Sequence, residues 1–373
     1  MILYTAITVI TVCLASLVQR QPEGNGAYIT KQQGLNIVGI SSIFLLLFGL
    51  AAFRLGVGND YGTYINTCHE IFVGGYVVTE PGFNFVVKTL YTIVGSTSYL
   101  VMFAFFAFMI AFVFLKAIYE QSPSFQMGIF LFMALGLYFR TFNTVRYYFV
   151  LGITLYAIKY VTRKQYGKFI ITILFAALFH KSVLVVIPMY LIAQMKWKKY
   201  YVIVLAVASG AVMLCQDLIM KIALILYPSY VDTIYLDQTS DLLTTISNIG
   251  RCGAVVALAV FFYKDAIEND EINQFHLKLN ILAIALYASC WFLPLISRFG
   301  YYLMTSQIVF VPRMLSMIGD EKKKKLATIA VVLVGILFFL DFLRTASADG
   351  IRVLPYHSWL FYEEEWRVGN SLF

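Results

Sequence analysis

The chain has 373 residues and carries 28 Lys and Arg against 20 Asp and Glu, which gives a formal net charge of +8. Hydrophobic residues make up 60% of it and charged residues only 13%, about half the ~25% of an ordinary soluble domain. So few charges cannot cover a globular surface in water, which excludes a soluble enzyme, a disordered chain and a nucleic-acid-binding module. The composition predicts a membrane protein that crosses the bilayer many times.

Apolar runs long enough to cross a bilayer recur along the chain, since one span needs ~20 apolar residues. They lie near residues 2–18, 35–53, 98–118, 125–139, 145–162, 200–222, 248–264, 278–296, 299–318 and 326–343. Two shorter runs, 168–179 and 182–195, flank His180 and Lys181. At ~1.5 Å rise per residue each is short for a span. They form either one long kinked helix or a hairpin of two broken helices.

The basic residues favour the hairpin, because Lys and Arg collect on the cytoplasmic side of membrane proteins. The connections that carry them are 163–168, 196–199, 264–278 and 322–325. They share one side only if 168–195 enters the membrane and returns on the same side. The hairpin also places 225–247 outside, a stretch with three Asp and no Lys or Arg. We therefore predict an all-α transmembrane bundle of about twelve segments, including broken and short helices, with both termini outside.

Two of the predicted external segments are long. Residues 54–97 mix glycine turns, aromatics and acids, and their second half, from about Gly82 to Gly95, predicts a short helix at the membrane interface. Residues 344–373 end the chain with aromatics and an acidic run, which suits an interfacial tail. We expect one membrane domain over 1–373. The five cysteines lack metal-ligand spacing, and we expect no metal and no cofactor.

Charged side chains are costly at membrane depth and usually serve a site or a pathway. Here most of them fall at the predicted outer ends of the apolar runs, and we expect them to converge in one pocket open to the exterior. The group consists of Arg54, Arg140, Arg146 and Arg298, the pair His180 and Lys181, and the acids Asp60, Glu70 and Glu80.

This combination of side chains fits a lipid pyrophosphate that carries a sugar. Arginine forks match phosphate oxygens and stay protonated, so we predict that the arginines and Lys181 bind a pyrophosphate. They can stabilise its departure without a metal ion. A carboxylate or imidazole beside them can take the proton of an attacking hydroxyl; Asp60 is the first candidate, His180 the second and Glu80 the third. The aromatics expected to pack on sugar rings and an isoprenoid chain are Tyr61, Tyr64, Tyr147 and Tyr301.

The same residues also have plain structural interpretations. Arg54 could extend from a helix end to lipid headgroups, and Asp60 could be a turn residue. Glu80, which precedes a proline, could simply start an interfacial helix. His180 and Lys181 interrupt an apolar run, which is hard to explain unless they face a cavity.

These residues carry a family resemblance as well. The segment RLGVGNDYGTY at 54–64, followed by EPGF at 80–83, resembles the first-loop signature of the EpsG family of bacterial polysaccharide polymerases. The arginine turn that ends at Arg146, FHKS at 179–182 and RFGYY at 298–302 follow in the order of that family. This chain has Arg146-Tyr147 where the family commonly has Arg-Gln.

The resemblance implies a Wzy-type polymerase, which joins lipid-pyrophosphate-linked oligosaccharide repeat units outside the cytoplasmic membrane. The fold would then resemble the GT-C-type membrane glycosyltransferases. The enzyme would be a metal-independent glycosyltransferase of the bacterial cytoplasmic membrane, with its active site facing outside. Its expected partners are polyprenyl-pyrophosphate-linked oligosaccharides, membrane lipids, a flippase and a chain-length regulator, and no nucleic acid.

Two other functions stay open at this point. A flippase would move the lipid-linked unit instead of joining it. Transporters place polar residues near the bilayer midplane and carry related halves, whereas most charges of this chain fall at the predicted outer ends of the apolar runs. An O-antigen ligase delivers a finished glycan to another lipid. It shares the chemistry of the polymerase and differs in its acceptor.

Overall fold

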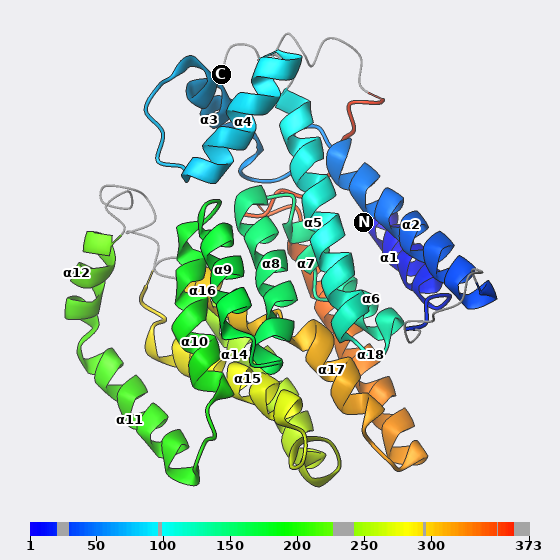
Figure 1. Cartoon of the computed structure of the whole chain (residues 1–373), viewed down its shortest axis with the longest axis vertical. Coiled ribbons are helices and arrows are strands. Elements are labelled where there is room, and N and C mark those ends of the chain that lie inside the picture. Colours follow the sequence, from blue (N-terminus) through cyan, green and yellow to red (C-terminus); the bar gives the residue numbers. More distant parts are fainter. Residues whose placement is uncertain (21–29, 96–98, 227–241, 294–295, 349, 362–373) are drawn as a thin grey trace. The chain divides into compact units, whose positions relative to one another are not determined.

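The computed structural model describes residues 1–20, 30–95, 99–226, 242–293, 296–348 and 350–361. Within these ranges every regular element is a helix (Figure 1), and strand-like pairing is limited to one isolated bridge between Arg54 and Ser358. The predicted all-α architecture is thereby confirmed. The contacts divide the chain into two compact units. Contacts alone do not define independently folding domains, so the single membrane domain over 1–373 stays a prediction.

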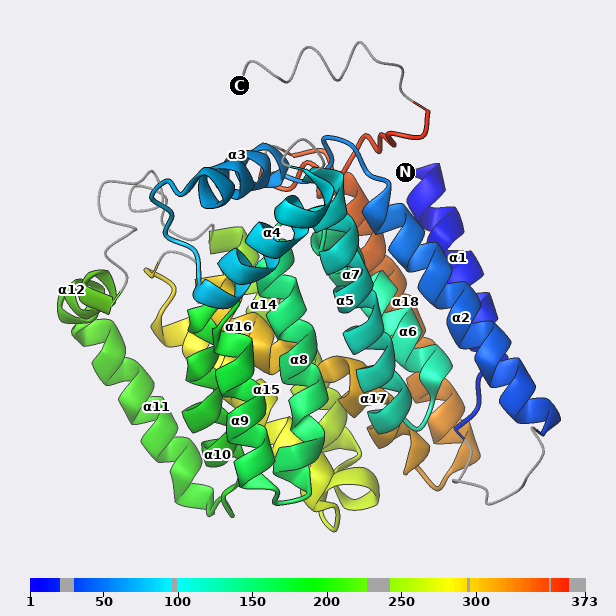
Figure 2. The same cartoon turned by 45° about the horizontal axis from the view of Figure 1, so that its top comes forward.

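The first unit comprises Met1–Tyr156, Leu178–His180 and Lys322–Phe373. Its helices are α1 (Ile2–Ala15), α2 (Lys31–Ala52), α3 (Tyr61–Val73), α4 (Pro81–Val94), α5 (Tyr99–Gln121), α6 (Phe125–Ala134), α7 (Leu137–Arg140), most of α8 (Val145–Thr162) and nearly all of α18 (Glu321–Thr345). Helix α1 packs against α2 and α6, and α2 packs along α5. Helices α3 and α4 lie side by side (Figure 2), and α4 also contacts α5.

The second unit comprises Ala157–Ala177 and Lys181–Glu321. Its elements are α9 (Tyr166–Ala177), η1 (Lys181–Val185), α10 (Val186–Gln194), α11 (Lys199–Leu214), α12 (Gln216–Leu226), α14 (Leu242–Phe261), η3 (Tyr263–Ile267), α15 (Glu271–Ser289), α16 (Ile296–Met304) and α17 (Gln307–Ser316). Helix α15 is its centre, because α10, α11, α14 and α16 all pack against it.

Local sequence signals explain where the helices of the segment 54–97 begin and end. Helix α4 starts with Glu80 as its N-cap and Pro81 at its first position, where the missing N–H of proline costs nothing. Helix α3 ends at Gly74, whose φ of 84° suits glycine. The structure therefore has a helix where the sequence predicts one near 82–95, and α3 occupies much of the first half of the same segment.

The membrane-span candidates are fewer than the predicted segments. In the described residues, four helices are long and apolar enough to cross a membrane: α2, α5, α18 and the part of α14 from Thr244 to Phe261. A fifth span results if the bent pair α11–α12 counts as one. Most other predicted runs form shorter helices, so the count of about twelve segments stays a prediction.

Three predicted runs are broken in the structure. The run 125–139 divides into α6 and α7 at Leu135 and Gly136. The run 200–222 bends by 81° between Leu214 and Gln216. The run 299–318 divides into α16 and α17 at Thr305 and Ser306. Both hydroxyls donate to carbonyl oxygens of α16, that of Thr305 to Tyr301 at 2.6 Å and that of Ser306 to Leu303 at 2.7 Å. Such back-bonding competes with the helical ladder and bends helices.

The region 168–195 forms a hairpin and not one kinked helix. Helices α9 and α10 are separated by the turn at His180 and the short helix η1. The ring of Phe169, near the start of α9, stacks on that of Tyr190, near the end of α10, with centroids 5.9 Å apart. The two helices are therefore antiparallel, as the charge pattern predicts.

Parts of the predicted external segments fall outside the described residues. They are residues 96 and 97 of the segment 54–97, residues 227–241 within the acidic segment 225–247, and residues 349 and 362–373 of the predicted tail.

Asp270 begins the central helix of the second unit and also joins it to α17. One carboxylate oxygen accepts a hydrogen bond from the N–H of Asn273 at 2.7 Å, and the other accepts one from Nη2 of Arg313 at 2.8 Å. Burial alone would raise the pKa of Asp270, but the hydrogen bonds and the charge of Arg313 lower it below its usual value. The carboxylate is therefore both a helix cap and one half of an ion pair.

Substitutions of Asp270 separate these two contributions. Asp270→Asn keeps an acceptor for the Asn273 N–H but loses the charge, whereas Asp270→Ala loses both. We expect Asp270→Ala to have the lowest unfolding temperature, because a lost N-cap costs ~1 kcal/mol. Thermal unfolding of the detergent-purified protein measures the order of the unfolding temperatures. Equal temperatures for the two variants would show that the hydrogen bond to the Asn273 N–H does not stabilise the helix.

The ion pair predicts a pH dependence of stability. Because the pKa of folded Asp270 is lowered, the higher stability of wild type relative to Asp270→Asn persists at neutral pH and is lost as pH falls through that lowered pKa.

Candidate functional site

Glu80 and Arg146 form an ion pair between two helices of the first unit. Glu80 is the N-cap of α4 and Arg146 lies in the first turn of α8, and Nη1 of Arg146 donates a hydrogen bond to a carboxylate oxygen of Glu80. The two side chains are 12% and 18% exposed. The guanidinium carbon lies 5.0 Å from the ring centroid of Phe83 and 5.9 Å from that of Tyr64. Charge and aromatic faces thus meet at a partly open position.

Asp60 lies at the start of α3 and contacts the chain just before α8. Its Oδ2 accepts a hydrogen bond from the hydroxyl of Thr144 at 2.7 Å. The neighbouring N–H of Asn59 donates to Oδ1 of Asn143 at 3.0 Å. Asp60 occupies the N-cap position of α3, but its side chain makes no capping bond. The carboxylate is directed to the arginine turn, so Asp60 and Arg146 lie at the same end of α8.

Two glycines allow this close approach. Gly58 has a φ of +106°, and a Cβ there would overlap the carbonyl oxygen of Phe142 in the arginine turn. The N–H of Gly82, in the first turn of α4, donates to the carbonyl oxygen of Leu178 at 2.8 Å. A Cβ on Gly82 would lie 2.8 Å from that same oxygen. Only a residue without a side chain fits at either position.

Arg54 is buried in the first unit and is only 1% exposed. Its Nη1 donates to the carbonyl oxygen of Ala51 at 2.5 Å, and its Nη2 donates to that of Phe142 at 3.4 Å. The guanidinium carbon lies 4.8 Å from the ring centroid of Phe103 and 5.3 Å from that of Phe142. Carbonyl dipoles and aromatic faces therefore stabilise this cation, and no carboxylate of the described residues forms an ion pair with it.

The C-terminal strap, residues 352–359, pairs with the backbone around Arg54. The N–H of Leu55 donates to the carbonyl oxygen of His357 at 2.9 Å, and that of Trp359 donates to Phe53 at 3.1 Å. The N–H of Gly58 donates to the carbonyl oxygen of Arg352 at 2.8 Å. These bonds fix the segment 53–58 between α2 and α3.

An aromatic cluster of Tyr61, Tyr64, Phe83 and Phe103 connects the two arginines. Tyr61 stacks on Phe103 with centroids 4.3 Å apart, and Tyr64 meets Phe103 edge-on at 6.3 Å. Tyr64 also meets Phe83 edge-on at 5.9 Å. Phe103 thus contacts the guanidinium of Arg54, while Tyr64 and Phe83 contact that of Arg146. Both tyrosines are 5% exposed, so their rings are covered by surrounding protein.

His180 lies next to α8 and is largely buried. Its ring meets that of Tyr147 edge-on, with centroids 5.6 Å apart. His180 ends the short segment Leu178–His180 that belongs to the first unit, and that segment also supplies the carbonyl oxygen for Gly82. The structure thus brings together Asp60, Glu80, Arg146, His180, Tyr64 and Tyr147 around the first turns of α4 and α8.

The remaining predicted site residues belong to other elements. Arg140 ends α7, and its guanidinium carbon is 5.8 Å from the ring centroid of Phe342 in α18. Lys181, Arg298 and Tyr301 belong to the second unit, on η1 and α16. Elements η1 and α16 are joined there, because the hydroxyls of Ser182 and Tyr302 are 2.9 Å apart. The hydroxyl of Tyr190, on α10, also donates to the carbonyl oxygen of Tyr302 at 2.8 Å.

One buried charge was not singled out in the sequence. Arg251 lies in α14, within a candidate membrane span, and is 6% exposed. Its Nε donates to Oε1 of Gln307 at 2.8 Å, and Nε2 of Gln307 donates to Oδ1 of Asn280 at 2.7 Å. The signal was a single arginine inside the apolar run 248–264, which is by default a functional candidate in a membrane protein. Thr144, the partner of Asp60, has no comparable signal.

The chemistry available in the first unit is acid–base chemistry next to a fixed positive charge. Asp60 and His180 are oxygen and nitrogen bases, and Arg146 offers a guanidinium that is partly open. In the part of the chain that the structure describes, no group of three or more His, Cys, Asp or Glu side chains is placed to hold a metal ion.

Comparison with known proteins gives one match. The family model described as the EpsG family matches residues 38–358, a range that includes all the predicted site residues. No curated protein and no solved structure matches the chain.

A double-mutant cycle tests the Glu80–Arg146 pair. Either Glu80→Ala or Arg146→Ala strands a partly buried charge, so we expect each single variant to unfold at a lower temperature than wild type. The double variant should be less destabilised than the two losses combined, with a coupling of roughly 1 kcal/mol for residues in direct contact. Thermal unfolding in detergent measures all four proteins. Strictly additive losses would show that the pair contributes nothing to the fold.

Proposed function

The chain belongs to the EpsG family, a family of Wzy-like polysaccharide polymerases, and we propose that it joins polyprenyl-pyrophosphate-linked oligosaccharide repeat units into a cell-surface polysaccharide. One observation carries the proposal beyond the family. The segments 54–64 and 80–83 and the arginine turn are far apart in the sequence, and they meet through the bonds Asp60–Thr144 and Glu80–Arg146. A carboxylate and a partly open guanidinium then lie at the same helix end, as transfer from a pyrophosphate requires.

The reaction that we propose is a direct displacement. A hydroxyl of the acceptor sugar attacks the anomeric carbon of the donor sugar, and a glycosidic bond forms. The bond from that carbon to the pyrophosphate oxygen breaks, and the lipid pyrophosphate leaves with the electron pair. The proton of the hydroxyl passes to a base on the protein. Pyrophosphate is a good leaving group, so most of the acceleration should come from positioning and charge stabilisation.

Asp60 is our proposed base. Its carboxylate is outside any ion pair of the described residues, and the Thr144 hydroxyl fixes its orientation. Glu80 is engaged by Arg146, so it suits a positioning role better than that of a base. His180 packs against Tyr147 and is our second candidate.

Arg146 is our proposed main contact for the pyrophosphate. Its guanidinium is partly exposed and is oriented by Glu80 and the faces of Phe83 and Tyr64. Arg54 is closed off from solvent, and we propose that it acts as a fixed positive charge behind the aromatic cluster. The roles of Arg140, Lys181 and Arg298 as phosphate ligands, and of Tyr61, Tyr64, Tyr147 and Tyr301 as sugar or lipid contacts, remain proposals from the sequence.

We further propose that the protein works in the bacterial cytoplasmic membrane with this site facing outside, without a metal ion, and together with a flippase and a chain-length regulator. The apolar helices and the family support the membrane location. The sidedness rests on the distribution of basic residues between the predicted connections.

A flippase remains the second candidate function because of Arg251. A polar network inside a candidate span is the feature expected of a transporter. The two functions separate in detergent solution, where there are no two compartments to move a lipid between. A ligase shares the chemistry, and the identity of its acceptor would distinguish it.

Arg146 variants test the pyrophosphate contact. Arg146→Lys keeps the charge but loses the two-pronged fork, and Arg146→Ala loses both. We expect purified protein in detergent to elongate lipid-linked repeat units, and both variants to give products limited to single units. Arg344→Ala is the matched control, because Arg344 is an exposed arginine paired with Asp341 on α18. Normal polymer length from Arg146→Ala would refute the pyrophosphate role, and no elongation by wild type would favour the flippase.

Asp60→Asn tests the base. The amide oxygen of Asn can still accept the Thr144 hydroxyl, so the fold and insertion should be unchanged while the proton acceptor is lost. We expect elongation to slow by about 10²–10⁴-fold, the usual contribution of general base catalysis. The initial rate of polymer formation measures it, and Asp341→Asn serves as the control. Full activity of Asp60→Asn would transfer the proposed role to His180.

A further inference from the structure

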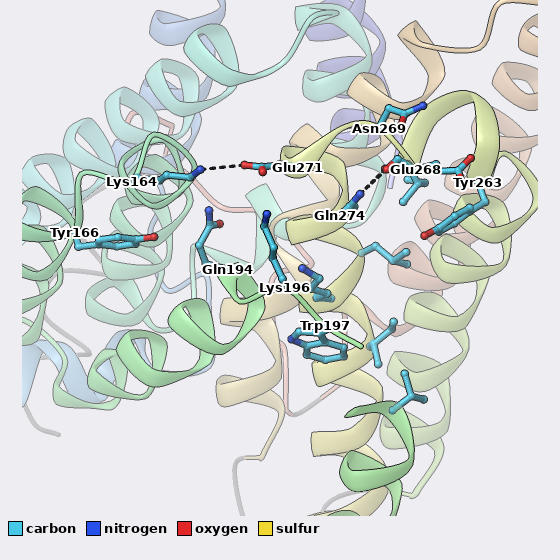
Figure 3. Close-up of a pocket in the computed structure, with 15 residues that line it drawn as sticks. Lys164, Tyr166, Gln194, Lys196, Trp197, Tyr263, Glu268, Asn269, Glu271 and Gln274 are labelled. Carbon is cyan, nitrogen blue, oxygen red and sulfur yellow. Dashed lines mark hydrogen bonds and ion pairs between the residues drawn. The ribbon is translucent and has the colours of Figure 1, made fainter. Parts of the chain in front are cut away.

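A cavity of about 660 Å³ lies in the second unit, and none of the predicted site residues lines it. Three connections between helices surround it (Figure 3). They are the start of α9 with Lys164 and Tyr166, the segment from Gln194 to Val202, and the segment from Tyr263 to Ile281. Each connection carries lysine, and these are the connections that the charge rule assigns to the cytoplasmic side.

The charges of the cavity are only partly compensated. Lys164 pairs with Glu271 at 3.2 Å. Nζ of Lys278 donates to the carbonyl oxygen of Met195 at 2.7 Å, which uses one of its three N–H groups. Lys196 extends toward the Lys164–Glu271 pair (Figure 3), and no carboxylate of the described residues forms an ion pair with it. Three lysines face two glutamates, so the lining keeps one positive charge in excess.

The cavity also has apolar and aromatic walls. Val202, Ile267, Leu277 and Ile281 contribute apolar surface. Trp197 is held in place by the hydrogen bond from its indole N–H to the carbonyl oxygen of Ile192 at 2.9 Å. Together with Tyr166 and Tyr263 it gives the cavity the amphipathic aromatics that are enriched where a membrane meets water. A wholly polar, soluble anion would leave these walls unused.

We propose that this cavity binds the headgroup of an anionic phospholipid with a single negative charge. Its phosphodiester lies between Lys196 and Lys278 and neutralises the excess positive charge. The side-chain amides of Gln194 and Asn269 line the cavity. In the proposed complex they form hydrogen bonds with the hydroxyls of a glycerol headgroup. The aliphatic walls on α11 and α15 receive the glycerol backbone and the start of the acyl chains. Basic pockets between helices on the cytoplasmic side are suited to such headgroups.

Native mass spectrometry of the full chain in detergent tests the proposal with phosphatidylglycerol and phosphatidylcholine as the probes. We expect one phosphatidylglycerol to be retained in preference to phosphatidylcholine. The double variant Lys196→Ala/Lys278→Ala should weaken that binding about thirty-fold, since each lysine near a lipid surface contributes about a factor of five. Lys323→Ala/Lys325→Ala removes the same charge from the exposed start of α18 and should leave this binding unchanged.

Two further measurements keep the result decisive. Lys278 contacts the backbone of the α10–α11 connection, so the double variant is used only if its unfolding temperature without lipid matches wild type. Otherwise Lys196→Ala, at an exposed side chain, should weaken binding about five-fold. Equal retention of the two lipids, or equal losses in the double variant and the α18 control, would overturn the proposal. So would sn-glycerol 3-phosphate binding as tightly as short-chain phosphatidylglycerol, because the cavity would then serve a soluble phosphate.

Discussion

An ion pair only 12% and 18% exposed holds the first turn of α4 against the first turn of α8, and the arrangement of the first unit's polar residues depends on it. Either partner alone would be a charge largely withdrawn from water, so the two are much more stable together than apart. Glu80 occupies the N-cap position of α4 and its side chain makes no capping bond, so the pair attaches the start of that helix to α8. The same first turn donates a backbone hydrogen bond to Leu178, which brings His180 to the face of Tyr147. The ion pair and this backbone hydrogen bond thus connect three parts of the chain.

Arg54 shows a different way to keep a cation inside an apolar unit. It has carbonyl oxygens and two aromatic faces around it, and the backbone that carries it is paired with the C-terminal strap. A guanidinium tolerates this because its charge is delocalised and weakly hydrated. Arg146 is oriented by a carboxylate and remains partly open. Two arginines on one aromatic cluster therefore have different environments, and only the exposed one can contact a ligand without moving.

The helices were predictable from the sequence because apolar runs of the right length leave a membrane chain few alternatives. The breaks were not, since neither hydropathy nor charge marks Cys215, where one run bends, or Thr305 and Ser306, where another divides. The hairpin at 168–195 was predictable because the charges on its flanks constrain it. The pairing of Glu80 with Arg146 spans 66 positions, and no spacing rule joins them. Both residues are identifiable from their charges at the predicted outer ends of apolar runs, whereas Arg251 lies inside a run whose hydropathy one arginine barely changes.

The hairpin also relates the proposed lipid-binding cavity and Lys181, a proposed phosphate ligand, to the membrane. Tyr166 at the start of α9 and Gln194 at the end of α10 both line the lysine-rich cavity, whereas Lys181 lies at the turn between the two helices. The 12 residues of α9 separate the cavity from that turn by about 18 Å. If the lysines of the cavity face the cytoplasm, as the charge rule requires, the turn at Lys181 lies deeper in the membrane by about this distance. The short helices α9 and α10 then place the proposed lipid-binding cavity and the proposed phosphate ligand Lys181 at opposite ends of one hairpin.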